Sequence, residues 1–280
     1  MVSQNYIYSK SNSLFCIVKY PEGGTPNSAV LLLPGFGESK SDLDYFLDNL
    51  SDYFIENGFA TVQVDFFAHG DSFGEFENLN CDILCQNIKS SIGYIKHNLG
   101  LDVFVVARGF YIELLADYSV CREIKGMVCV NPIKIKTEII DYLDRYFDTQ
   151  EKFIEFNELE DAILVSKFLT LLGAEPDNLM GQKISRFFIK DIFTRIKNKA
   201  WSEKNYKNIV WITSNSETNG LNVDYLYSQI PYKTLEYYDG YGFSRDLFWQ
   251  YQLSIRILAS IIYIKEGSPY EHTSSIPKSR

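Results

Sequence analysis

The stretch DFFAHGDSFG, residues 65–74, joins a short run of small and β-branched residues to a segment with the pattern of a helix. A second glycine-containing turn, PGFG at residues 34–37, follows the apolar run Ala29–Leu33 in the same way. Short apolar runs that end in glycine turns are typical of strands buried on both faces of a sheet. The two turns therefore predict a strand buried on both faces at Ala29–Leu33, another strand at Ala60–Asp65, and a loop at the end of each.

Strands and helices alternate along much of the chain, which is typical of a mostly parallel sheet covered by helices on both faces. The pattern predicts an α/β fold with seven or eight strands. Besides the two strands above, we predict strands at Leu14–Lys19, Asp102–Val106, Gly126–Val130, Ile209–Thr213 and Thr234–Tyr238, and helices after an N-cap at Ser41, at Asp82–Leu99, at Tyr111–Tyr118, near Val223–Gln229 and at Arg245–Lys265.

The alternation stops at residues 136–204, where the pattern is helical and rich in Phe and Tyr and predicts no strand. We interpret this segment as a helical lid inserted above the sheet. Residues 1–135 and 205–266 then form the core, and the polar residues 267–280 form a loose tail. The aromatic side chains of the lid either line a pocket for an acyl chain or an aromatic ring, or pack the lid onto the sheet.

Composition and charge exclude several classes of protein. Apolar residues make up 46% and charged residues 22%, as in an average soluble domain. The formal charge of −9 gives no electrostatic reason to bind nucleic acid or anionic lipid. No apolar run approaches the roughly 20 residues of a membrane span, and the first residues lack the pattern of a signal peptide. We therefore expect a cytoplasmic protein with no membrane span.

Cysteine and histidine usage argues against metal chemistry. The chain has five cysteines without a CxxC pair, which favours reduced thiols over a disulfide framework. Cys81 and Cys85 are four residues apart on a predicted helix, and we expect them to be semi-buried thiols because no further ligands are nearby. No glycine-rich phosphate or dinucleotide loop is present. We therefore expect no metal and no cofactor.

The two loops together resemble those of the α/β-hydrolase superfamily. Its members typically carry a PGF or HGF turn after one strand and the pattern D-x-x-G-H-G-x-S-x-G after the next, with Ala68 here in place of the first glycine. The sequence is most similar to the serine aminopeptidase-like branch, which includes cinnamoyl and feruloyl esterases and the acyl-carrier thioesterase of luminous bacteria. The resemblance covers about residues 29–265 and implies an α/β-hydrolase fold with a lid.

The reaction of this family needs a serine on a strand-to-helix elbow, a histidine, an acid and two backbone N–H groups that hold the oxyanion. The elbow position reads ARGFY at residues 107–111, so the resemblance puts Gly109 at the nucleophile. It puts Phe243 at the histidine and Glu217 at the acid. Gly109 has no side chain to attack with, and Phe243 cannot take a proton. Glycine does tolerate the strained backbone of an elbow.

Four neighbouring residues are candidates for the binding site. The resemblance assigns the oxyanion donors to the backbone N–H groups of Phe36 and Phe110. Arg108 either adds positive charge to this site, or faces solvent or pairs with a nearby acid. Tyr111 either crowds the junction of strand and helix or points into the pocket.

None of the three histidines is well placed to replace the missing one. His272 lies in the predicted tail and His97 near the end of a predicted helix. We expect His69 to brace its own loop through a hydrogen bond, and the alternative is an acid/base pair with Asp65.

These features predict a catalytically degenerate hydrolase, a pseudoenzyme that binds a small acyl or aromatic ligand or a protein partner. Without a nucleophile and a base, an oxyanion site and substrate binding contribute only about 10³-fold over water. Two alternatives stay open. One is an active esterase, thioesterase or acyltransferase with an unrecognised nucleophile. The other is a non-hydrolytic enzyme that uses Arg108, Glu217 or a tyrosine as acid or base.

Overall fold

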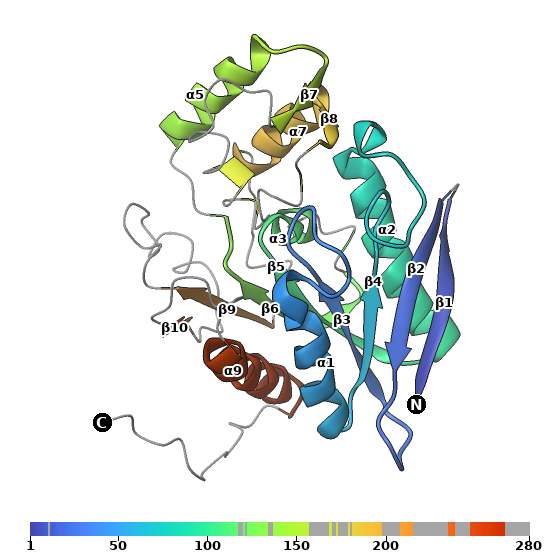
Figure 1. Ribbon diagram of the computed structural model, residues 1–280. Coiled ribbons are helices and arrows are strands. Elements are labelled where there is room, and N and C mark those ends of the chain that lie inside the picture. Colours follow the sequence, from blue (N-terminus) through green and yellow to red (C-terminus); the bar gives the residue numbers. More distant parts are fainter. Residues whose placement is uncertain are drawn as a thin grey trace.

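The computed structural model describes residues 1–10, 12–116, 120, 122–133, 137–156, 168–169, 172, 179, 181–197, 208–214, 235–238 and 247–266. Within these ranges an eight-stranded sheet is covered by helices on both faces (Figure 1). Its strands, in their order across the sheet, are β1 (Val2–Ser9), β2 (Asn12–Lys19), β4 (Ala60–Val64), β3 (Ser28–Leu33), β5 (Asp102–Arg108), β6 (Ile124–Val130), β9 (Ile209–Ser214) and β10 (Leu235–Tyr238).

The sheet is mostly parallel. β1 pairs antiparallel with β2, and β2 antiparallel with β4, whereas the pairs from β4 to β10 are all parallel. β3 lies between β4 and β5, with Leu31 opposite Val62 on one side and Val105 on the other. All six residues of β3 are buried, as in a parallel strand covered on both faces. The predicted fold class is therefore confirmed.

Two hydrophobic cores lie on opposite faces of the sheet, because successive side chains of a strand point to opposite sides. Leu32 packs into the core under α1 (Phe46–Glu56) and α9 (Leu247–Glu266). Leu31 packs into the other core, under α2 (Cys81–Gly93) and α3 (Phe110–Leu115). A π-helical turn, η3 (Tyr94–Leu99), extends α2.

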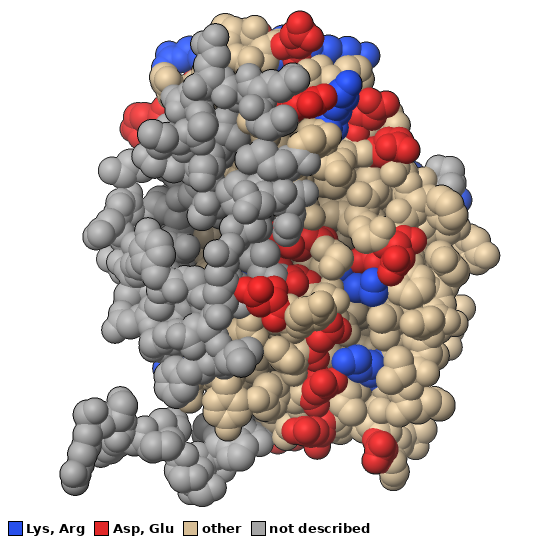
Figure 2. Space-filling view, viewed as in Figure 1, with Lys and Arg blue, Asp and Glu red and all other residues tan. Residues whose placement is uncertain are grey.

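Acidic side chains predominate over α1 on the face that Figure 2 shows. Asp48, Asp52 and Glu56 follow one another at intervals of four residues and so share one side of this helix. Lys19 contacts Asp52 at 2.8 Å. The acidic side chains on this face are in line with the formal net charge of −9 of the whole chain. No helix of the described chain is both long enough and apolar enough to cross a bilayer.

The segment between β6 and β9 packs beyond the carboxyl ends of the central strands (Figure 1). We call its described residues, from Thr137 to Lys197, the β6–β9 segment. It comprises helix α5 (Thr137–Asp148), strand β7 (Phe153–Glu155), strand β8 (Lys183–Ser185) and helix α7 (Arg186–Lys197). β7 and β8 pair antiparallel, with Ile154 opposite Ile184.

The prediction that this segment lacks strands is wrong. Each of the two strands is only three residues long, too short to show a periodic pattern in the sequence. The lid boundaries at residues 136–204 stay a prediction.

One other local prediction is also wrong, and one strand was missed. Ser41 does not cap a helix: a 3₁₀ turn, η1 (Leu43–Tyr45), precedes α1, and Tyr45 is the N-cap. β1 was not predicted, because its sequence VSQNYIYS is largely polar. The predicted helix near Val223–Gln229 and the tail 267–280 lie outside the described residues.

Candidate active site and its surroundings

A sharp turn joins β5 to α3 at Gly109. Arg108 is the last residue of the strand, Phe110 is the first of the helix, and Gly109 between them has φ 58° and ψ −126°. A positive φ is readily accessible only to glycine. The Gly109 N–H donates to the Val130 carbonyl oxygen at 3.3 Å. The turn lies at the carboxyl edge of the strands, where ligands bind in open α/β sheets.

Two aromatic side chains meet beside this turn. Phe36, from the loop after β3, and Phe110 lie edge to face with ring centroids 5.7 Å apart. Phe188 of α7 contacts both rings, at 5.8 Å from Phe36 and 6.2 Å from Phe110. All three side chains are buried. The β6–β9 segment therefore packs directly on the two loops that flank Gly109.

Two further rings complete what we call the aromatic cluster, namely Phe36, His69, Phe76, Phe110 and Phe188. Phe76 lies on a 3₁₀ turn, η2 (Phe76–Asn78), and its ring centroid is 6.1 Å from that of Phe36. His69 lies 5.0 Å from Phe76 and 6.3 Å from Phe36. Phe36 is thus the common neighbour of the other four.

His69 braces its own loop, as predicted. Its Nδ1 lies 2.8 Å from the Phe67 carbonyl oxygen, and its backbone N–H donates to the Phe66 carbonyl oxygen at 2.9 Å. Burial lowers the pKa of His69, against smaller raising effects of the Phe67 carbonyl and of the charge on Asp65. The described hydrogen bonds do not include one between His69 and Asp65, so the alternative of an acid/base pair has no support.

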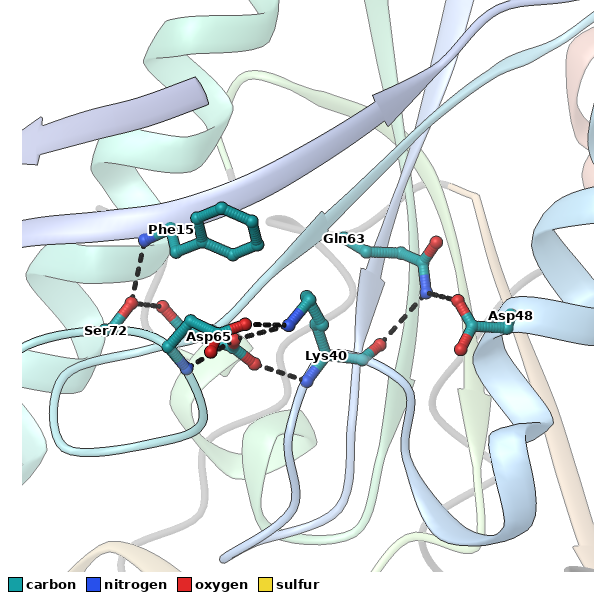
Figure 3. A network of polar contacts seen from close by, with 7 residues as sticks. Phe15, Lys40, Asp48, Gln63, Asp65 and Ser72 are labelled. Atoms are coloured by element: carbon teal, nitrogen blue, oxygen red, sulfur yellow. Dashed lines mark hydrogen bonds and ion pairs between the residues drawn. The ribbon is translucent and has the colours of Figure 1, made fainter. Parts of the chain in front are cut away.

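Asp65 instead joins the loop after β3, which carries Lys40, to its own loop after β4 (Figure 3). Its carboxylate accepts hydrogen bonds from the Lys40 backbone N–H at 2.6 Å, from Lys40 Nζ at 2.8 Å and from the Asp71 N–H at 2.9 Å. Lys40 Nζ also contacts the Asp71 carboxylate at 2.8 Å and lies over the Phe15 ring. The Ser72 hydroxyl accepts from the Phe15 N–H and donates to the Asp65 carbonyl oxygen.

Arg108 pairs with an acid, one of the outcomes expected from the sequence, but it does so in the interior. Its Nε donates to Asp42 Oδ2 at 2.8 Å and its Nη2 to Asp42 Oδ1. Both side chains are buried. Asp42 Oδ1 also accepts from the Gly35 N–H at 3.3 Å. The pair ties the end of β5 to the loop that carries Phe36, and the charge of Asp42 offsets that of Arg108.

Tyr111 lies in the core at the junction of strand and helix. The residue is fully buried, and its ring lies 5.0 Å from that of Phe66. Burial raises the pKa of its phenol far above the usual range. Of its two predicted positions the structure thus favours the crowded junction.

The remaining predicted site residues lie outside the described residues. These are Glu217 and Phe243, whose assignments as acid and histidine positions stay predictions. Cys81 and Cys85 are buried thiols, whereas the sequence predicted semi-buried ones. Within the described ranges no group of three His, Cys, Asp or Glu residues is placed to hold a metal ion.

Sequence reasoning missed three residues that build the site. Lys40 and Asp42 follow the PGFG turn, and their charges were the available signal, but nothing in the sequence names Asp65 and Arg108 as their partners. Phe188 is one of many aromatic residues in its segment, and no pattern distinguishes it from Phe187.

No family model and no curated protein sequence matches this chain. Solved structures do match it. Est1E from Butyrivibrio proteoclasticus, solved with ferulic acid bound, is 15% identical, with a TM-score of 0.67 over 93% of this chain and 99% of its own. A soluble variant of monoglyceride lipase from Saccharomyces cerevisiae, in complex with a substrate analogue, is 16% identical, with a TM-score of 0.64 over 96% of each chain.

The α/β hydrolase GrgF from Penicillium sp. sh18 is 16% identical, with a TM-score of 0.60 over 92% of this chain and 98% of its own. At these identities the likeness shows the fold alone. The chain has the α/β-hydrolase fold, as the two loops in its sequence predicted.

Proposed function

We propose that this protein is a catalytically degenerate α/β hydrolase that binds a small acyl or aromatic ligand beside Gly109. The observation that carries the proposal is Gly109 itself. It occupies the turn between β5 and α3 with a positive φ, at the position that the resemblance assigns to the nucleophile. Glycine at this position preserves the backbone conformation of the elbow but supplies no side chain that could attack a substrate.

The surroundings support binding rather than catalysis. The aromatic cluster supplies apolar surface, and the N–H groups of Phe36 and Phe110 are the proposed donors to a ligand carbonyl or carboxylate. Among the described residues, neither N–H donates a hydrogen bond to another backbone group. The assigned positions of Glu217 and Phe243 complete the proposal, since a phenylalanine leaves no base. Aromatic neighbours and a few polar groups are typical of small-molecule sites.

We further propose that residues 136–204 act as a lid over this site and that the protein works in the cytoplasm. Phe188 supports the first point, because it packs against both Phe36 and Phe110. The alternative is a protein partner held on the surface of the protein. Est1E with its bound ferulic acid and monoglyceride lipase with its substrate analogue support a small-molecule ligand, because both proteins have a similar fold.

The test is hydrolysis of p-nitrophenyl acetate, butyrate and octanoate by the native chain and three variants. We expect the native chain and Gly109→Ala to give the blank rate. Gly109→Ser alone has a hydroxyl without a base and stays near the blank. The double variant Gly109→Ser/Phe243→His restores nucleophile and base, and we expect measurable turnover.

A native rate far above the blank would overturn the proposal, above all if a fluorophosphonate labelled one serine of the native chain. The binding arm uses the same native protein. Its melting temperature is measured with butyrate, octanoate, benzoate and cinnamate, and we expect at least one of these probes to raise it.

A further inference from the structure

His69 has a hydrogen-bonding group that the packing of the described chain does not use. The side chain is 3% exposed, and Nδ1 lies 2.8 Å from the Phe67 carbonyl oxygen. Because a carbonyl oxygen only accepts hydrogen bonds, Nδ1 carries the hydrogen of the neutral ring and Nε2 carries the lone pair. Nε2 is buried, and no described residue donates a hydrogen bond to it.

This arrangement is costly if it serves packing alone. A buried acceptor without a donor costs about 1–3 kcal/mol. The neighbours of the ring are Phe36 and Phe76, at 6.3 and 5.0 Å. A phenylalanine in place of His69 would fill similar space among these rings without an unused acceptor. Burial also lowers the pKa of His69, so the ring is neutral near pH 7 and Nε2 remains an acceptor.

The position of this acceptor connects it to the proposed ligand site. Phe36 contacts both His69 and Phe110, the residue after Gly109. The β6–β9 segment covers the same region, because β8 packs against η2, which carries Phe76, and Phe188 packs against Phe36. His69 thus belongs to the loops at the carboxyl edge of the sheet, and its neighbours Phe36 and Phe76 both contact the segment proposed as the lid.

We propose that His69 Nε2 accepts a hydrogen bond from a hydroxyl group of the ligand. The ligand class is then an aromatic or other apolar molecule that carries a hydroxyl group, with a phenol as the simplest member. The inference rests on the proposed function, since it names the polar group with which the ligand is recognised. Phe36 and Phe76 supply ring surfaces for the apolar part, and Nε2 supplies one directed polar contact.

The lone pair on His69 Nε2 requires a hydrogen-bond donor on the ligand, and a hydroxyl group supplies one. A neutral imidazole nitrogen without hydrogen cannot donate, so ethers and carboxylates, which only accept, gain nothing at Nε2. A site built to bond a hydroxyl rejects an analogue that lacks it, because the buried acceptor then stays unpaired. Discrimination between a phenol and its methyl ether is therefore the property that this geometry predicts.

The experiment measures, by calorimetric titration, the binding of 4-propylphenol, its methyl ether 4-propylanisole, and propylbenzene. We expect the native chain to bind the phenol about 10-fold more tightly than either of the others. His69→Phe keeps an aromatic ring and removes the acceptor, and we expect it to bind all three probes equally. His97→Phe is the matched control at an exposed histidine, and we expect it to keep the native preference.

A second variant guards against a folding defect in His69→Phe. His69→Gln keeps an acceptor oxygen, and we expect part of the preference to return. In native protein the ¹⁵N resonance of His69 Nε2 is expected to shift with 4-propylphenol and not with 4-propylanisole.

The outcomes separate this inference from the proposed function. If the native chain binds none of the three probes nor any of the four carboxylates, the proposed function fails and the inference fails with it. If the native chain binds the probes without preference, or if His69→Phe keeps the preference, the inference is wrong and ligand binding stands. A water molecule as the only partner of Nε2 would give this second result.

Discussion

At Gly70 the backbone passes so close to the Asp65 carboxylate that no side chain fits. Gly70 has φ +48°, and a Cβ atom built on it would overlap the Asp65 carboxyl group. That carboxyl group is fully buried and accepts three hydrogen bonds from Lys40 and Asp71. A side chain at residue 70 would therefore displace the acid that holds both loops of the site.

We expect Gly70→Ala to lower the free energy of unfolding by at least about 3 kcal/mol. About 1–2 kcal/mol comes from the positive φ, and the rest comes from disturbed bonds to a buried charge. Gly23→Ala is the matched control, because Gly23 has φ +76° and open space around its Cβ position. Urea denaturation of both variants checks the difference, and equal losses would contradict it.

The buried pair of Arg108 and Asp42 leads to a second prediction about single residues. Arg108→Met leaves Asp42 buried without its guanidinium partner, which costs about 3–5 kcal/mol for a buried pair. Arg108→Met/Asp42→Asn removes both charges, and we expect it to recover a large part of that loss. Lys19→Met is the comparison at the more exposed Lys19–Asp52 pair and costs less than about 1 kcal/mol. The measurement is again urea denaturation, and an Arg108→Met loss no larger than that of Lys19→Met would refute the argument.

Helix α7 attaches the β6–β9 segment to the site through one face. Phe188 is 2% exposed and contacts Phe36 and Phe110, whereas its neighbour Phe187 is 60% exposed. Asp82 of α2 adds a contact to Arg195 of α7 at 3.2 Å. The apolar contact dominates this attachment, since Asp82 is largely exposed and exposed pairs contribute little.

We expect Phe188→Ala to cost about 3–5 kcal/mol through the cavity that it leaves, and Phe187→Ala to cost less than about 0.5 kcal/mol. Hydrogen exchange of α7 separates two forms of the loss. Faster exchange confined to the β6–β9 segment indicates that the segment opens locally, whereas faster exchange throughout indicates global destabilisation. Similar costs for the two variants would contradict the packing described here.

The reach of sequence reasoning differs from element to element. β3 was predictable, since a run such as Ala29–Leu33 with no polar residue suits only a strand buried on both faces. β1 was not, because its stability comes from pairing with β2 and from α2 rather than from its own composition. Ser41 satisfies the rule for a helix N-cap, but Asp42 beside it takes a positive φ and pairs with Arg108. A contact between residues 66 positions apart overrides a local preference.

In the site, too, local features could be predicted from the sequence and long-range contacts could not. The position of Gly109 follows from a motif, and its positive φ agrees with the turn that the motif implies. The partners of Arg108 and Lys40 come from other loops, and no local pattern specifies them. Such contacts depend on the three-dimensional arrangement of the strands.

The whole molecule is expected to be most stable between about pH 6.5 and pH 9. The folded-state pKa of His69 is lowered, so as pH falls through 6.5 the unfolded chain takes up a proton that the folded chain does not, and stability is lost. Burial raises the pKa of Cys16 from 9.0 to about 11. Above pH 9 the unfolded thiol ionises first, and stability falls again by about 2–3 kcal/mol up to pH 11.

Urea denaturation from pH 5.5 to pH 10.5 checks both sides of this window. His69→Phe is expected to flatten the acid side and Cys16→Ala to reduce the loss on the alkaline side. The buried Cys81 and Tyr111, whose pKa values are also raised, leave a residual alkaline loss. A profile of His69→Phe that is unchanged below pH 6.5 would contradict the assignment of the acid side.

The order of strands in the sheet has a consequence for synthesis on the ribosome. Apart from the exchange of β3 and β4, the strands lie side by side in the order in which they are translated. β4 pairs with both β2 and β3, and β5 and β6 then each join an edge that already exists. About 80 residues then separate β6 from β9, its next neighbour.

At about 5–20 residues per second, β6 stays an open edge for about 4–16 s. That edge is the apolar run from Met127 to Val130, and it is buried in the finished protein. During this interval the nascent chain exposes a strand edge with which other chains can pair. This is therefore the stage of synthesis at which a chaperone would most usefully shield the strand.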